Sequence, residues 1–277
     1  MKKSYLIADS GGTKTDWCYV DVFGTKNYFT TASYHPNLMS DEWINSNKAF
    51  WNQYTLIDNL EVHFYGSGCL KEPNKSKVEF IFKTFGFKNV CIESDILAAA
   101  RACFGDMDGF VGILGTGSVL AEIENREVKN VYGGLGSIIG DEGSGFYFGK
   151  LLIEKYVKNE FSKVTNEEIE SVIGIENLID LNSSDSSFKE FVSSFSSKFS
   201  ATKNQEIKQL HRDNISLFFD KYLPMNNSNL RICFVGSYAQ YTRKIINDSL
   251  AKRSVNLGVI ITRPIEFLTE YSIKSIL

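Results

Sequence analysis

Two short turns rich in glycine, serine and threonine carry residue types that bind phosphate. The first is Asp9-Ser-Gly-Gly-Thr-Lys-Thr15 and the second is Gly115-Thr-Gly-Ser118, each between two apolar strands. Glycine lets backbone N–H groups approach phosphate oxygens, hydroxyl groups donate further hydrogen bonds, and a lysine adds a positive charge. The predicted phosphate contacts are Gly11, Gly12, Thr13, Lys14 and Thr15 in the first turn and Gly115, Thr116, Gly117 and Ser118 in the second.

Both turns belong to a repeated arrangement of three strands. In each copy a strand enters the turn, a second strand leaves it, and a third follows a short polar turn, at 26–32 and at 127–132. A tight hairpin with glycine at positive φ explains either turn alone, and the spacing is not that of a Walker loop. The duplication favours two loops that hold one nucleoside triphosphate from both sides of a cleft.

Two aspartates lie where such a site needs carboxylates. Asp95 precedes an alanine-rich helix and is the predicted catalytic base, which accepts the proton of a substrate hydroxyl as it attacks the γ-phosphate. The alternative for Asp95 is a helix N-cap, a position that aspartate favours. Asp9 ends the first strand and is suited to hold Mg²⁺ through water, because Mg²⁺ keeps much of its hydration shell.

A segment with six glycines in fourteen residues runs from Tyr132 to Gly145. Irregular segments of this kind in a compact domain usually line a site, and a mobile surface loop is the alternative. Ile138 and Ile139 within it predict partial burial. Asp141 also lies in this segment.

Two further positions are candidates for ligand contact. Gly236 and Ser237 follow the apolar strand 231–235, at a strand-to-helix junction where α/β sheets bind ligands, although a plain turn explains them equally well. Asn37 follows the third strand, and its amide could donate to and accept from sugar hydroxyls. A turn asparagine is the other explanation for Asn37.

Length and composition predict two α/β domains. The chain has 277 residues, 43% of them apolar, and alternating strand and helix patterns predict mixed sheets covered by helices. The turn cluster 105–109 places the boundary between domains 1–108 and 109–277, with the last helix able to pack back on the first domain. A net charge of −3 without a basic run argues against nucleic acid or membrane partners.

No leader or membrane-spanning pattern is evident in the sequence, so we expect a cytoplasmic protein. The five cysteines are odd in number and widely spaced, which predicts reduced, buried thiols.

Together these segments resemble the sugar kinase/actin/Hsp70 superfamily, and within it the BadF/BadG/BcrA/BcrD ATPase family with its N-acetylglucosamine kinases. The match spans essentially the whole chain, and Gly-Asp-Glu-Gly-Ser144 is its most specific part. The resemblance implies two actin-like (ribonuclease H-like) domains with mixed five-stranded sheets around an interdomain nucleotide cleft. It implies ATP and Mg²⁺ as cofactors, a homodimer, and phosphate transfer to a hydroxyl of an amino sugar, foremost N-acetylglucosamine.

The same resemblance implies roles for single residues. Asp95 matches the catalytic aspartate and Gly236-Ser237 the adenosine motif, while Asn37 and Asp141 match sugar contacts, with Gly134 and Leu135 beside them in the pocket. Leu135 stands where relatives specific for N-acetylglucosamine often have tryptophan. The zinc-binding cysteine cluster of the ROK sugar kinases is absent.

Two other functions fit parts of the pattern. A BadF-type ATPase would pass an electron to an acyl-CoA dehydratase or reductase from an iron–sulfur cluster shared by two subunits. Cys69 and Cys103 are its candidate ligands by position alone. A catalytically silent sugar sensor would have lost the carboxylate of Asp9 or Asp95, and both are present.

Overall fold

The chain divides into two compact units, and the first of them is built from two separate stretches of the sequence. The computed structural model describes residues 3–174, 186–224 and 230–274. One unit combines the residues up to Asp106 with those from Arg263 onward, and the other runs from Met107 to Thr262. The division expected from sequence, 1–108 and 109–277, therefore differs mainly in the final helix, α11 (Pro264–Lys274), which is part of the first unit.

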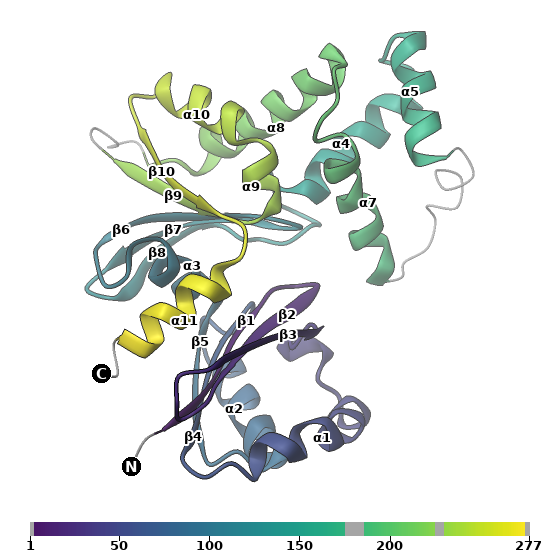
Figure 1. Ribbon diagram of the computed structural model, residues 1–277. Coiled ribbons are helices and arrows are strands. Elements are labelled where there is room, and N and C mark those ends of the chain that lie inside the picture. Colours follow the sequence, from purple (N-terminus) through teal and green to yellow (C-terminus); the bar gives the residue numbers. More distant parts are fainter. Residues whose placement is uncertain (1–2, 175–185, 225–229, 275–277) are drawn as a thin grey trace. The chain divides into compact units, whose positions relative to one another are not determined.

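The first unit is a five-stranded mixed sheet with helices on both faces (Figure 1). Its central strand pairs antiparallel with one neighbour and parallel with the other. The strand order is β3 (Lys26–Ala32), β2 (Lys14–Val20), β1 (Ser4–Ser10), β4 (Leu60–Gly66) and β5 (Asn89–Ser94). A short 3₁₀ helix, η1 (Pro36–Leu38), follows β3.

Alternation along β1 divides the apolar residues of the first unit between two layers. Leu6 and Ala8 pack in a cluster with residues of α1 (Asp41–Thr55) and α2 (Asn74–Phe85). Ile7 packs on the other face with Ala98 of α3 (Asp95–Phe104) and with Ile265 and Leu268 of α11. Successive strand residues point to opposite faces, so one strand serves both layers. The apolar stripe of α11 explains why the last helix completes the first unit.

The second unit repeats the same sheet. Its strand order is β8 (Glu127–Gly133), β7 (Ser118–Glu124), β6 (Gly109–Leu114), β9 (Arg231–Val235) and β10 (Asn256–Ile261). β6 pairs antiparallel with β7 and parallel with β9, as β1 does with β2 and β4. The two sheets therefore share strand order and direction, which confirms the predicted α/β class with two five-stranded mixed sheets.

Helices surround the second sheet, and two of them approach very closely. A Cβ on Gly149 of α4 (Gly145–Val157) would overlap the carbonyl of Val192 on α7 (Ser186–Lys198). The serine-rich stretch expected as a helix over 183–200 is α7 within the described residues, and its expected start at 183–185 lies outside them. The remaining helices are α5 (Lys163–Ile173), α8 (Gln205–Tyr222), α9 (Ser237–Tyr241) and α10 (Arg243–Ala251).

The cysteines differ in burial, contrary to the expectation of uniformly buried thiols. Cys18, Cys69 and Cys233 are buried, whereas Cys91 is exposed and Cys103 is partly exposed. Cys91 lies on β5, the edge strand of its sheet, where fewer elements cover the side chains. Within residues 3–174, 186–224 and 230–274, no helix combines the length and the apolar character needed to cross a membrane.

Candidate functional site

The first turn presents backbone donors to its surroundings. Gly11 N–H donates to the carbonyl of Lys14 at 3.0 Å, which closes the turn between β1 and β2. In the described part of the chain, the N–H groups of Gly12 and Thr13 have no acceptor. Neither Gly11 nor Gly12 has a positive φ, so the hairpin between β1 and β2 does not by itself require glycine at these two positions. A Cβ atom added to Gly12 would have no other atom within 4 Å, so the space beside this residue is open to a ligand.

The Thr15 hydroxyl lies inside this turn. Thr15 Oγ1 is 2.7 Å from Ser10 Oγ, and both oxygens accept a hydrogen bond from Tyr34 N–H at 3.2 Å. Ser33 Oγ donates to the carbonyl of Gly11 at 2.7 Å. Thr15 is fully buried. The hydroxyl predicted to contact phosphate therefore stabilises the turn from within.

Lys14 projects outward beside a carboxylate. Its Nζ is 2.7 Å from Asp16 Oδ2, and the lysine side chain is 58% exposed. Asp16 Oδ1 also accepts a hydrogen bond from Thr30 Oγ1 at 2.7 Å. The positive charge expected in the turn is present, and Asp16 holds it near the end of β1.

Asp9 and Asp95 lie close enough in the first unit for their charges to interact. Burial, together with the charges of Asp95 and Asp16, raises the pKa of Asp9 to about 7, against a lowering effect of Lys14. In the part of the chain that the structure describes, no hydrogen-bond donor to the Asp9 carboxylate is found. A carboxylate without donors beside two others is an unfavourable anion, which a bound cation would stabilise.

Asp95 is not the N-cap of its helix. Ser94 caps α3, because its side chain accepts a hydrogen bond from Leu97 N–H. Asp95 Oδ1 accepts a hydrogen bond from Ile96 N–H at 2.9 Å, and the hydroxyl of Ser67 is a further donor to this carboxylate. Burial raises the pKa of Asp95 and these two hydrogen bonds lower it, and the resulting pKa is about 6. The N-cap explanation for Asp95 is therefore wrong.

Sequence reasoning missed Ser67 as a site residue. It follows β4, and its N–H donates to the carbonyl of Ser10 at 2.8 Å, so it joins the first turn to Asp95. Its position after a parallel strand, in Gly66-Ser-Gly68, was the available signal.

Asn37 is in η1, and its side chain is exposed. Its N–H donates to His35 Nδ1 at 3.2 Å, and Lys77 Nζ holds the neighbouring carbonyl of Pro36 at 2.6 Å. Gly68, at φ +80, approaches the His35 ring so closely that a Cβ would lie 2.8 Å from His35 Nε2. The backbone of η1 is thus fixed while the Asn37 amide is accessible.

The second turn repeats the pattern of donors. Gly115 N–H donates to the carbonyl of Gly117 at 3.0 Å, and the N–H groups of Thr116 and Gly117 have no acceptor among the described residues. The start of α4 binds the same turn, since Gly145 N–H donates to the Gly115 carbonyl at 2.8 Å and Phe146 N–H to the Thr116 carbonyl at 3.4 Å.

Ser118 is engaged by its own chain on both of its polar groups. Its N–H donates to Asp141 Oδ1 at 3.2 Å, and its Oγ donates to the carbonyl of Glu142 at 2.6 Å. Asp141 is buried at φ +66, and its Oδ2 is 3.2 Å from Lys189 Nζ. The structure therefore brings together Gly115–Ser118 and Asp141, whereas Ser118 has no donor left to offer a ligand.

The glycine-rich segment is exposed in its first half. Gly133, Gly134 and Gly136 have positive φ, which turns the chain away from β8. Leu135, Ile138 and Ile139 are 58%, 91% and 70% exposed. The segment is partly buried as expected, but its burial begins at Gly140 and Asp141, whereas Ile138 and Ile139, the residues that suggested it, are exposed.

The second half of this segment is anchored by residues that the sequence did not reveal as part of a site. Asn214 is fully buried on α8; its Oδ1 accepts from Gly143 N–H at 2.7 Å, and its Nδ2 donates to the Ser144 carbonyl and to Tyr238 Oη, both at 3.0 Å. Glu142 is paired with Lys221 and accepts from Tyr222 Oη. A lone amide on the apolar face of α8 was the only signal for Asn214.

Gly236 lies against the end of β6, beside the second turn. At φ +119, an added Cβ would overlap the carbonyl of Leu114 and lie 3.2 Å from Gly115 N. Its N–H donates to the carbonyl of Ile261 at 3.0 Å. Packing alone thus requires glycine here, and Ser237 next to it is exposed at the start of α9.

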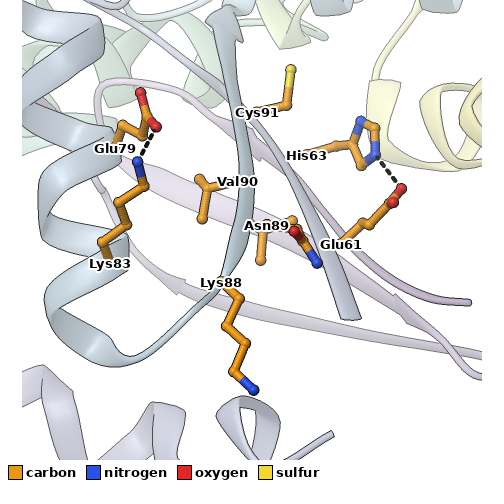
Figure 2. A pocket seen from close by; sticks show the side chains of 9 residues that line it. Glu61, His63, Glu79, Lys83, Lys88, Asn89, Val90 and Cys91 are labelled. Carbon is orange, nitrogen blue, oxygen red and sulfur yellow. Dashed lines mark ion pairs between the residues drawn. The ribbon is translucent and has the colours of Figure 1, made fainter. Parts of the chain in front are cut away.

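An open pocket of about 360 Å³ lies elsewhere in the first unit (Figure 2). It opens beside the beginning of β4 and β5, whereas the first turn follows the far end of β1, since Ser4 pairs with Leu60 and Ser10 with Gly66. Its lining residues are Glu61, Val62, His63, Glu79, Lys83, Lys88, Asn89, Val90 and Cys91. This pocket includes none of the predicted site residues.

Candidate metal ligands do not cluster among the residues that the structure describes. Within its described ranges, no group of three or more histidine, cysteine, aspartate or glutamate side chains could hold a metal ion. Cys69 is fully buried in the core of the first unit, which does not suit a cluster shared between two subunits.

Comparison with known proteins places the fold. No family model matches the chain, and no curated protein sequence matches it significantly. A solved structure named "putative N-acetylglucosamine kinase" from Porphyromonas gingivalis is 27% identical, with a TM-score of 0.88 over 99% of this chain and 100% of that one. One with the same name from Chromobacterium violaceum is 15% identical, with a TM-score of 0.72 over 97% and 98%.

A ROK family glucokinase from Streptomyces griseus, solved with glucose and AMPPNP, is 15% identical, with a TM-score of 0.57 over 98% of each chain. All three matches extend over nearly the full length of both partners. The chain has the actin-like sugar kinase fold.

Proposed function

We propose that the chain is an ATP-dependent sugar kinase, which transfers the γ-phosphate of ATP to a hydroxyl of an amino sugar, N-acetylglucosamine or a close relative. One observation carries the proposal: two turns in equivalent places of two equivalent sheets each present two adjacent N–H groups without an acceptor in the described chain. Adjacent backbone donors of this kind bind phosphate oxygens. The amino sugar is suggested by the name of the P. gingivalis structure.

Phosphate binding follows from the donors of the two turns. Gly12 and Thr13 supply N–H groups in the first turn, and Thr116 and Gly117 supply them in the second. Lys14 adds a positive charge. Because its side chain is exposed, its ammonium group can leave Asp16 and pair with a phosphate oxygen instead. Gly236 and Ser237 would bind the adenosine, because Gly236 adjoins Gly115.

Asp95 is the proposed catalytic base. A pKa of about 6 keeps its carboxylate ionised at neutral pH, yet makes it more basic than an exposed aspartate. The donors Ile96 N–H and Ser67 Oγ fix its orientation. The carboxylate can therefore accept the proton of a sugar hydroxyl without first losing one itself.

The residues around Asp9 fit a magnesium ion held largely by water and phosphate. Asp9 offers an acceptor that lacks a donor among the described residues, and its pKa is raised by burial and by the charges of Asp95 and Asp16. Mg²⁺ commonly binds proteins through one or two carboxylates while phosphates and water complete its shell. When bound, the ion would neutralise charge on the phosphates. Asp9 would position it through a water molecule.

Sugar recognition is assigned to Asn37, Gly134, Leu135 and Asp141. The assignment is supported for Asn37 by its accessible amide on a fixed backbone, and for Leu135 by its exposed apolar side chain. Asn37→Ala should raise KM for the sugar and leave KM for ATP unchanged. An unchanged sugar KM would remove Asn37 from the pocket.

The experiment that tests the function is a coupled assay of ADP release with a panel of sugars. The panel holds N-acetylglucosamine, N-acetylmannosamine, glucosamine, N-acetylmuramic acid and glucose, each with ATP and Mg²⁺. We expect release that depends on one of the amino sugars and stops when Mg²⁺ is chelated. Release that is independent of every sugar would contradict kinase activity, and release with glucose alone would contradict the amino-sugar assignment.

A further inference from the structure

Lys189 and Asp141 form an ion pair directly beside the second turn. Lys189 Nζ is 3.2 Å from Asp141 Oδ2, while Asp141 Oδ1 accepts the hydrogen bond from Ser118 N–H. The Asp141 side chain is only 4% exposed, whereas that of Lys189 is 40% exposed. One carboxylate thus joins a lysine on α7 to the backbone of the turn.

The packing of two helices brings Lys189 to this place. Gly145 and Gly149 of α4 have no side chain, so α7 approaches until Val192 touches Gly149 and Ser196 touches Gly145. Gly145 is also the residue whose N–H binds the Gly115 carbonyl. The close approach of the helices therefore fixes Lys189 relative to the turn as well as to α4.

The surroundings of Asp141 make the lysine more important than an ordinary surface partner. A buried carboxylate is costly without a counter-charge, and removal of one partner from a buried pair costs far more than from an exposed pair. Asp141 also has left-handed backbone geometry at φ +66, which its hydrogen bonds must maintain. Gly117 lies against it, since an added Cβ would be 3.1 Å from Asp141 Oδ1.

We propose that Lys189 is a positioning residue for the nucleotide: it holds the Asp141 carboxylate, which in turn holds the second turn so that the N–H groups of Thr116 and Gly117 face the phosphates. This inference rests on the proposed function and adds to it a residue on α7. It also gives Asp141 a role toward the phosphates through Ser118. Lys189 itself touches neither substrate.

The test measures binding of AMPPNP, ADP and adenosine to the full chain by isothermal titration calorimetry, without sugar. Lys189→Met should weaken binding of AMPPNP about tenfold, within the range of coupling measured for residues that share one network. ADP should weaken similarly, whereas binding of adenosine, which has no phosphate, should not change. Lys189→Arg should restore most of the affinity, because arginine also pairs with a carboxylate.

Two controls separate the proposal from simpler effects. Lys189 Nζ lies over the ring of Phe146, and Lys198 on the same helix lies over the rings of Phe191 and Phe195. Lys198→Met therefore removes a comparable lysine, and it should leave AMPPNP affinity unchanged. In an Asp141→Asn background, Lys189→Met should change AMPPNP affinity by less than about twofold, because the lysine would then have no carboxylate to hold.

The outcomes are distinguishable. If the wild type binds no AMPPNP, both the kinase function and the role of Lys189 are refuted. If the wild type binds and a folded Lys189→Met variant, checked by its thermal midpoint, binds equally well, only the role of Lys189 is refuted. An undiminished loss in the Asp141→Asn background would mean that Lys189 acts on the phosphates directly, which would also overturn the proposal.

Discussion

The two turns proposed to bind phosphate occupy equivalent places in sheets of the same strand order, yet they are stabilised by different means. In the first unit, hydroxyl groups of Ser10, Thr15 and Ser33 support the turn, and charged residues surround it. In the second unit, the turn itself has no charged residue, and the segment Asp141–Phe146 holds it by four hydrogen bonds. Part of each support follows the third strand of its sheet, Ser33 after β3 and the segment Asp141–Phe146 after β8, so the architecture is shared and the side chains are not.

This difference suggests a division of work between the units. The carboxylates with raised pKa values, Asp9 and Asp95, belong to the first unit and suit the chemical step. The second unit offers a rigid, neutral turn that suits positioning. If so, substitutions near the first turn should alter turnover, and substitutions near the second should alter affinity or stability.

The largest expected effect tests the chemical role of the first unit. Asp95→Asn should lower kcat roughly a hundredfold or more, the usual contribution of general-base catalysis, while AMPPNP affinity stays within about twofold because Asn retains the acceptor for Ile96 N–H. Steady-state kinetics and calorimetry measure both values. Asp41→Asn is a matched control, because exposed Asp41 begins α1 behind a Ser40 cap as Asp95 begins α3 behind Ser94. A variant that kept most of its turnover would remove Asp95 as the base.

The next effect tests the rigid support of the second turn. Asn214→Ala should lower the free energy of unfolding by about 3 kcal/mol, because Gly143 N–H, the Ser144 carbonyl and Tyr238 Oη all lose a buried partner. Urea denaturation measures the change. Gln209→Ala removes an exposed amide from the same helix α8 and should cost less than about 0.5 kcal/mol. A cost for Asn214→Ala as small as that of the control would show that the amide does not anchor the segment.

A smaller effect concerns pH and the cost of keeping Asp95 ionised. Its pKa in the folded chain, about 6, exceeds the ordinary value of 3.8, so the folded state binds this proton more tightly than the unfolded state does. This contribution to stability is full below the ordinary pKa and is lost as pH rises through 6. Asp95→Asn should therefore raise the free energy of unfolding at pH 8 by about 1 to 2 kcal/mol relative to wild type, and by little at pH 4. Denaturation at both pH values would reveal this; an equal difference at both would contradict it.

The smallest effect compares one glycine from each of the two turns. Gly12→Ala should leave stability within about 0.5 kcal/mol of wild type, because its Cβ meets open space, yet weaken AMPPNP binding about fivefold by obstructing the phosphate. Gly117→Ala should lower both quantities, since its Cβ would crowd Asp141 Oδ1. Thermal melts and calorimetry distinguish the two. Unchanged affinity in Gly12→Ala would remove the first turn from the phosphate site.

The elements that repeat along the sequence were predictable, because local patterns determine them. Strands expected at 26–32 and 231–235 are β3 and β9 with the same bounds, and the serine-rich stretch is helical because its phenylalanines recur at helical spacing. The exposure of Ile138 and Ile139 was not predictable from their hydrophobicity, since three glycines with positive φ direct that segment outward.

The supporting residues of the site could not be read from the sequence for a different reason. Ser67, Lys189 and Asn214 act through contacts between elements distant in the chain, such as the hydrogen bond from Gly143 to Asn214 and the ion pair from Asp141 to Lys189. No local motif encodes such pairs. The packing of α11 on the first unit likewise depends on a tertiary contact, because its apolar side chains cover the face of the sheet that carries Ile7.

The position of α11 has a consequence for how the protein is made. A ribosome releases this helix only after it has synthesised all of the second unit, yet Ile265 and Leu268 complete the apolar layer around Ile7 and Ala98. Until then, one apolar face of the nascent first unit must stay exposed to solvent or to chaperones. The first unit, although most of it is synthesised before the second, is therefore completed only after the second unit has been synthesised.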